Sequence, residues 1–190
     1  ILKMFPRARV TLLADTNQAI ISELNTTSKE KLAEIYNAKT ITLNKSYRST
    51  KEINSYALQL LPEEKRYEIF ERSGEEVKEI SGNIEEFKNE VKELAENSPS
   101  TCIITRNLKE TIEVYNELKT EIDGLRICDN KSFELSHNPI VMPLALTKGL
   151  EFDNVIVYDK DGAFSGEENK KYLYMASTRA LHRLTIFNCK

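Results

Sequence analysis

Four short stretches of the sequence contain the side chains that could do chemistry. They are "LLADTNQAI", with Asp15 and Gln18; "LNKSYRST", with Tyr47 and Arg48; "LTKGLEF", with Lys148, Gly149 and Glu151; and "YLYMASTRALHRL", with Arg179. Arginines present several N–H donors in a plane, and an aromatic ring offers a flat apolar face. Two arginines, an amide and a ring therefore suit an anionic phosphate chain that carries a planar base.

A structural role is the simpler interpretation of each stretch taken alone. A Tyr-Arg pair before a helix usually belongs to a surface turn, and an arginine on a helix is usually solvated or ion-paired. Gly149 is more informative, because a glycine just ahead of Glu151 indicates a positive φ or a close approach of the backbone. The four stretches together, in this order, favour a binding site over four unrelated surface features.

Two sequence features of nucleotide hydrolysis are missing. None of the six glycines is followed by lysine, so the sequence contains no GxxxxGK[ST] loop to hold phosphates. It also contains no Asp-Glu dipeptide of the kind that binds magnesium. We therefore expect no nucleotide hydrolysis by this chain alone, and we assign no metal ligand within it.

The bulk composition limits the class of protein. A net charge of −3 and a pI near 5.6 argue against a generally basic surface, so any contact with nucleic acid must be local. The three cysteines form no CxxC pair, which favours a reducing cytosol. No apolar run approaches about 18 residues, so no membrane span is expected. Because the sequence opens on Ile1, we expect it to be part of a longer protein.

Strand-like and helix-like segments alternate along the chain and must position these residues. Such alternation predicts an α/β fold with a mainly parallel sheet flanked by helices. The predicted strands are 9–15, 39–43, 76–81, 101–105, 125–128, 139–146, 154–159 and 183–188. In such sheets ligands bind at the carboxyl ends of strands, so "TKGLE" is expected at the carboxyl end of the strand 139–146.

Helix starts are predicted where a capping residue is followed three positions later by an acid. This spacing occurs at Ser49, Asn83, Asn107 and Ser165. Arg179 is expected on an amphipathic helix that turns Tyr172 and Met175 toward the sheet. The acidic stretch 63–79 is interpreted as a solvated loop or helix face.

Together the four stretches resemble motifs of the UvrD/Rep/PcrA-type superfamily 1 helicases. "LADTNQAI" is similar to the "GD..QSI" of motif III, and "NKSYRST" is similar to the "NYRS" of motif IV. "LALTKGLEFDNVIV" resembles motif V, "TLHSAKGLEFD.V..", and "YLYMASTRALHRL" resembles "YVA.TRA...L" of motif VI. The motifs occur in family order, and their short spacing is closest to the helicase-IV or HelD-like branch.

The resemblance implies the C-terminal part of such a helicase. Residues 1–38 would be the tail of the first RecA-like domain, and residues 39–190 would be the second RecA-like, P-loop NTPase-type domain without a large 2B insertion. It implies ATP and Mg²⁺ as cofactors, with the Mg²⁺ ligands in an upstream RecA-like domain. Single-stranded DNA or DNA junctions would be the partners, in the cytoplasm and without a membrane.

The resemblance also implies the roles of individual residues. Tyr47 would stack on adenine, Arg48 would reach the γ-phosphate, and Gln18 would sense it. Glu151 would accept hydrogen bonds from the sugar, Gly149 would let the loop pass close by, and Arg179 would act as the arginine finger. Thr105 and Arg106 would contact nucleic acid, and Lys148 would either hold the loop of Gly149 and Glu151 or meet a nucleic-acid phosphate. Two arginines supplied from a second domain would stabilise the charge that develops on the transferred phosphoryl group.

The sequence departs from the family mainly where DNA is bound. The motif V threonine and histidine align with Pro143 and Ala145, and the stacking aromatics of motif III have no counterpart. In "IITRN" only Arg106 of an aromatic-arginine pair is kept, with Thr105 beside it. These departures leave a second interpretation open: a nucleotide- or partner-binding helicase-like module, either a degenerate subunit or an RNA-polymerase-associated remodeller that does not unwind DNA.

Overall fold

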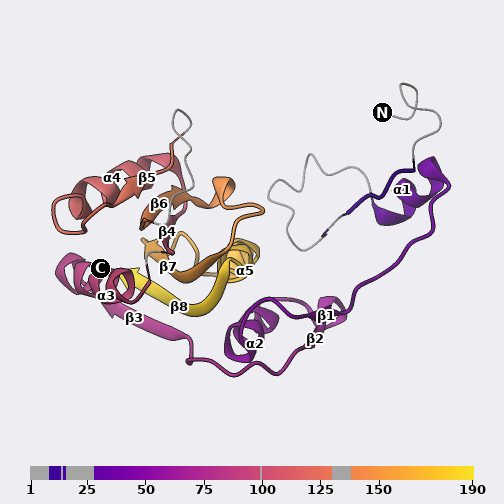
Figure 1. Cartoon of the computed structure of the whole chain (residues 1–190), viewed down its shortest axis with the longest axis horizontal. Helices are drawn as coiled ribbons and strands as arrows, with labels where there is room; N and C mark the ends of the chain where they lie inside the picture. Colours follow the sequence, from indigo (N-terminus) through magenta and orange to yellow (C-terminus); the bar gives the residue numbers. More distant parts are fainter. Residues whose placement is uncertain (1–8, 14, 16–27, 99, 130–137) are drawn as a thin grey trace. The chain divides into compact units, whose positions relative to one another are not determined.

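The computed structural model describes residues 9–13, 15, 28–98, 100–129 and 138–190 (Figure 1). The chain divides into two compact units, residues 1–42 and residues 43–190. The described part of the first unit contains one helix, α1 (Lys29–Tyr36), whose N-cap Ser28 accepts a hydrogen bond from the Lys31 N–H at 3.2 Å. The other described helices and strands belong to the second unit.

The second unit is built on a six-stranded, entirely parallel sheet with strand order β3-β8-β7-β4-β6-β5 (Figure 1). The strands are β3 (Lys78–Gly82), β4 (Thr101–Thr105), β5 (Arg126–Ile127), β6 (Ile140–Pro143), β7 (Phe152–Lys160) and β8 (Ala180–Cys189). The central strands are apolar along most of their length, as strands covered on both faces should be. The predicted α/β fold with a mainly parallel sheet is confirmed.

Helices cover both faces of this sheet. The helix α3 (Ile84–Asn97) buries Phe87 and Val91 against one face, and α4 (Leu108–Leu118) buries Val114 and Leu118 there. The same core includes Ile156 and Tyr158 of β7. Because side chains alternate along a strand, Val155 and Val157 of β7 point to the opposite face. There α5 (Lys170–Ser177) contacts β7, β8 and the helix α2 (Lys51–Gln59).

A second, two-stranded sheet precedes the large one. It consists of the parallel strands β1 (Lys45–Ser46) and β2 (Glu68–Ile69), with a 3-10 helix, Glu63–Lys65, between α2 and β2. The stretch 63–79 is therefore not simply the solvated loop or helix face that its charge indicates. It contributes a strand beside the residues of the predicted adenine contact.

The predicted helix caps divide into two groups. Asn83 forms a full capping box with Glu86, and Asn107 accepts a hydrogen bond from the Glu110 N–H at 3.0 Å, as predicted. The caps predicted at Ser49 and Ser165 are wrong. The Ser49 hydroxyl donates instead to the Ala180 carbonyl at 2.6 Å, and the Ser165 hydroxyl donates to the Asp159 carboxylate. In both cases a tertiary hydrogen bond takes the hydroxyl that the cap would have used.

Some predicted strands are shorter than expected or do not form. The strand predicted over 139–146 ends at Pro143, after which Leu144–Leu146 form a 3-10 helix. The segment 39–43 and the described residues of 9–15 form no strand, and Leu13 and Leu43 are largely exposed. An apolar run is an incomplete strand signal, because a strand also needs a neighbour to pair with.

Candidate functional site

The predicted site residues of the second unit lie at two different edges of the six-stranded sheet. We call the edge at which the parallel strands begin the amino edge, and the edge at which they end the carboxyl edge. Glu151 directly precedes β7 and Arg179 directly precedes β8, so both lie at the amino edge. The first residues of these strands, Phe152 and Ala180, are partners in the ladder, which makes the two site residues neighbours.

The prediction that "TKGLE" lies at the carboxyl end of a strand is wrong. Because β6 ends early, the 3-10 helix and residues 147–151 carry the chain from the carboxyl edge back to the start of β7. Gly149 lies in this crossing with φ 85°, in the left-handed region that favours glycine. A Cβ there would meet nothing within 4 Å, so the backbone turn, rather than a close contact, calls for glycine. Lys148 beside it is exposed.

Arg48 and Glu151 form an ion pair at the amino edge. Arg48 Nε lies 2.7 Å from Glu151 Oε1, and the two side chains are 43% and 39% exposed. Two of the predicted nucleotide contacts are thus brought together from distant parts of the sequence. A pair this exposed contributes about 0–1 kcal/mol to stability, so either partner can exchange it for a ligand at small cost.

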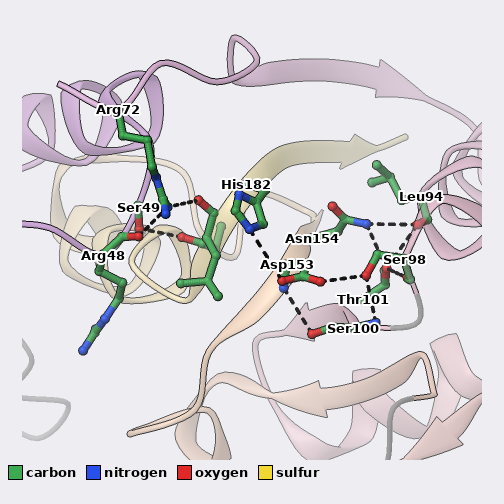
Figure 2. Close-up of polar contacts among 12 residues, drawn as sticks. Arg48, Ser49, Arg72, Leu94, Ser98, Ser100, Thr101, Asp153, Asn154 and His182 are labelled. Carbon is green, nitrogen blue, oxygen red and sulfur yellow. Dashed lines mark hydrogen bonds and ion pairs between the residues drawn. The ribbon is translucent and has the colours of Figure 1, made fainter. Parts of the chain in front are cut away.

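The turn that carries Arg48 is fixed to β8 by polar contacts, of which the bond from Ser49 is buried (Figure 2). The Ser49 hydroxyl donates to the Ala180 carbonyl, and Arg72 Nη2 donates to the carbonyls of Arg48 and Leu181 at 2.5 and 3.1 Å. In Figure 2 the Arg48 guanidinium extends away from this cluster of contacts. The backbone of Arg48 is therefore held, while its side chain forms the exposed ion pair with Glu151.

Tyr47 presents an exposed aromatic ring next to Arg48. It is 63% exposed, and its ring lies 5.3 Å from the ring of Phe70, which is 45% exposed, at an interplanar angle of 36°. Lys45 Nζ lies 5.7 Å and 5.8 Å from the two ring centroids. Exposed rings beside a cation suit an aromatic base attached to phosphates.

Arg179 is 2% exposed, unlike the helix-edge arginine that the sequence predicts. The helix α5 ends at Ser177, so Arg179 lies beyond it and not on it. Its guanidinium donates to the carbonyls of Met175 at 3.2 Å and Leu150 at 3.3 Å, and to the Thr178 hydroxyl at 3.1 Å. The bond to Leu150 ties Arg179 to the loop that carries Glu151.

Thr105 and Arg106 lie at the carboxyl edge, at the end of β4, as predicted. Thr105 is fully buried, and its hydroxyl lies 2.6 Å from the Thr111 hydroxyl. A direct contact between Thr105 and nucleic acid does not fit this burial. Arg106 is partly exposed, its backbone N–H donates to Glu110 Oε2 at 3.0 Å, and its Cζ lies 3.6 Å from the Tyr172 ring centroid. A nucleic-acid contact by Arg106 remains a prediction.

The remaining predicted residue, Gln18, lies outside the described residues. In the part of the chain that is described, no group of three or more His, Cys, Asp or Glu side chains could hold a metal ion. Across the same residues, no helix has the length and apolar character needed to cross a membrane.

The sequence patterns do not identify two aromatic residues that contact predicted site residues, Phe70 beside Tyr47 and Tyr172 beside Arg106. Phe70 lies within the acidic stretch 63–79, where the charge pattern obscured a short strand. Tyr172 was expected to face the sheet, but Tyr174 is the buried tyrosine of α5 and Tyr172 is only partly buried. In an eight-residue helix a shift of two positions is enough to exchange the buried and the accessible ring.

Comparison with known proteins supports the fold. No protein-family model matches the chain, and no curated protein does. The C-terminal domain of a possible DNA helicase from Lactobacillus plantarum WCFS1 is similar at 28% identity and a TM-score of 0.60, over 76% of this chain and 88% of that one. An Arterivirus nonstructural protein 10 (helicase), solved with DNA, matches at 12% identity and a TM-score of 0.40, over 60% of this chain and 28% of that one. The first match supports a helicase-type fold for the parallel sheet and its helices, without singling out any helicase branch.

Proposed function

We propose that the chain is the C-terminal part of an ATP-dependent superfamily 1 DNA helicase or translocase of the UvrD/Rep/PcrA type, acting in the cytoplasm. Residues 1–38 would complete a first RecA-like domain and residues 39–190 would form the second. The similarity to the C-terminal domain of a possible DNA helicase supports this proposal. ATP would contact the amino edge of the second domain, with the phosphate-binding loop and the Mg²⁺ ligands supplied from outside this sequence.

The arrangement of the amino edge is the observation that carries the proposal. Arg48, Glu151 and Arg179 come from three separate segments and are connected there by an ion pair and by the bond from Arg179 to the Leu150 carbonyl. With Tyr47 exposed beside them, the edge offers a ring for a base, a carboxylate for sugar hydroxyls and a guanidinium for phosphate. This donor set fits ATP.

The proposed chemistry requires the ion pair to open. Arg48 would leave Glu151 for the γ-phosphate, while Glu151 would accept hydrogen bonds from the ribose. Arg179, held by backbone carbonyls, would orient the loop of Gly149 and Glu151 and would reach the phosphate only after a rearrangement of this edge. Positive charge fixed near the transferred group stabilises the charge that develops there.

The proposal can be tested by ATP turnover. The purified 190-residue chain should hydrolyse no ATP, with or without single-stranded DNA, because it contains no phosphate-binding loop. The longer protein that the proposal requires should show DNA-stimulated hydrolysis, and Arg48→Ala should reduce it strongly. Robust turnover by the 190-residue chain would overturn the domain assignment.

A second candidate function is a helicase-like module that binds nucleotide or a protein partner, such as RNA polymerase, without unwinding DNA. The burial of Thr105, where the family carries a DNA-contacting aromatic, favours it. The upstream sequence separates the two candidates, since an intact phosphate-binding loop indicates a motor. A protein with that loop but without DNA-stimulated turnover would support the second candidate.

A further inference from the structure

The carboxyl edge contains an arginine that is stacked on an aromatic ring from another element. Arg106, which follows β4, has its Cζ 3.6 Å from the centroid of Tyr172 in the first turn of α5. Lys171 Nζ lies 4.8 Å from the same centroid. A guanidinium this close to a ring centroid lies against the ring face, which is the cation–π arrangement that arginine favours.

Other cations near this edge are already paired with carboxylates. Lys109 and Lys160 lie 3.9 Å and 3.5 Å from the carboxylate of Glu113, and Lys170 lies 2.5 Å from that of Glu167. Each of these three lysines therefore has a carboxylate beside it, with Lys109 and Lys160 sharing that of Glu113.

Arg106 and Lys171 differ, because neither forms an ion pair with a residue that the structure describes. Glu110, the acidic residue that contacts Arg106, accepts hydrogen bonds from its backbone N–H at 3.0 Å and from Asn107 Nδ2 at 2.8 Å. That carboxylate fixes the backbone of Arg106 and the start of α4. The positive charge of the guanidinium is left for a partner outside the chain.

We propose that Tyr172 is a positioning residue that holds the Arg106 guanidinium for a phosphate of single-stranded nucleic acid, with Lys171 as a second cation. The inference rests on the proposed function and specifies how its nucleic-acid contact is made. The ring holds one face of the guanidinium, so the N–H groups at its edge stay free to donate to phosphate oxygens. Because the guanidinium covers the ring face, the contact is to the backbone of the strand and not to a base.

The test is binding of a fluorescein-labelled oligo(dT) to the purified protein, followed by anisotropy at several KCl concentrations. Arg106→Ala should weaken binding and flatten the plot of log affinity against log salt by about 0.7, the value for one phosphate on a single strand. Tyr172→Leu should weaken binding roughly two- to fivefold, the effect of a lost cation–π contact. Tyr172→Phe should bind like the wild type, because the ring face is kept.

The double variant separates positioning from a direct contact. If Tyr172 acts through Arg106, Arg106→Ala with Tyr172→Leu should bind no more weakly than Arg106→Ala alone. Lys119→Ala, at the other end of α4, removes one charge as a control and should leave the salt dependence unchanged. Circular dichroism should show that each variant is folded.

Three outcomes would overturn the inference. Wild-type binding by Tyr172→Leu, with Arg106→Ala weakened, would remove the positioning role and leave the proposed nucleic-acid contact in place. Additive losses in the double variant would make Tyr172 an independent contact. Unchanged binding by Arg106→Ala would remove both the inference and the proposed nucleic-acid role of this edge.

Discussion

The predicted binding arginines at the two edges of the sheet are held by different kinds of contact. At the amino edge the charged groups are bonded to the protein itself: Arg48 pairs with Glu151, and Arg179 is buried among carbonyls. At the carboxyl edge Arg106 rests on an uncharged ring and forms no ion pair with any described residue.

This difference supports the proposal that the two edges bind different ligands. A site whose charges already bond to each other must rearrange when a ligand arrives, and so it can report whether the ligand is present. An arginine that is stacked on an aromatic ring, without an ion pair to break among the described residues, can bind and release successive phosphates without rearrangement. The first behaviour suits a nucleotide that is hydrolysed in each cycle, and the second suits a strand that moves through.

The largest expected effect is at the buried arginine of the amino edge. Arg179→Ala should lower the free energy of unfolding by about 2–3 kcal/mol, because a charged donor is lost and the Leu150 carbonyl loses its partner. In the longer protein, turnover should fall by roughly 10³-fold, the effect of removing an arginine finger. Urea unfolding and steady-state hydrolysis measure the two effects.

Arg183→Ala is the matched control for this substitution. Arg183 pairs with Glu75 at 2.6 Å and is partly exposed, so its loss should cost less than about 1 kcal/mol. Arg179→Lys should recover little of the stability and turnover lost in Arg179→Ala. An ammonium group cannot donate in the fixed plane of the guanidinium to the Met175 and Leu150 carbonyls and the Thr178 hydroxyl. A stable Arg179→Ala variant would contradict the structural account of this edge.

Removal of the hydroxyl that fixes the Arg48 turn should change the free energy of unfolding by less than the loss of Arg179. Ser49→Ala removes a buried hydrogen bond to the Ala180 carbonyl and should lower the free energy of unfolding by about 1 kcal/mol. Ser55→Ala, at an exposed position of α2, should change it by less than about 0.5 kcal/mol. Equal effects of the two substitutions would show that the turn is not held in this way.

The exposed ion pair should matter for binding far more than for folding. A double-mutant cycle on Arg48→Ala and Glu151→Ala should give a coupling of at most about 1 kcal/mol in unfolding, because both side chains are well exposed. Each single substitution should nevertheless weaken nucleotide binding in the longer protein. A large coupling in unfolding would mean that the pair is a structural element and not an open site.

The smallest expected effect lies at the ion pairs between α3 and the turn that follows α4. Hydrogen bonds from Lys92 and Lys88 lower the pKa of Glu121 in the folded protein below its usual value near 4.5. The stabilisation is therefore present above about pH 4.5 and is lost as the pH falls through the folded-state pKa. Melting temperatures of Glu121→Gln and the wild type should differ slightly at pH 7 and should converge at low pH and in high salt.

Strands with strong local signals can be predicted from the sequence more accurately than the geometry of the site. "TCIIT" forms β4 over the predicted residues. The apolar run marks the strand, and Asn107, which caps α4, marks where the strand must end. Glu151 was assigned to the wrong edge, because nothing in "PIVMPLAL" shows that the strand stops at Pro143. The caps at Ser49 and Ser165 failed because their hydroxyls bond to residues distant in sequence or in another element. Local patterns cannot predict such tertiary bonds.

A crossed comparison of two variants decides whether the two edges bind different ligands. In the longer protein, the affinities for a fluorescent ATP analogue and for labelled oligo(dT) would be measured for Tyr47→Ala and for Arg106→Ala. We predict that Tyr47→Ala weakens nucleotide binding and leaves DNA binding unchanged, while Arg106→Ala does the reverse. A loss of nucleotide affinity in Arg106→Ala with DNA affinity intact would contradict the account.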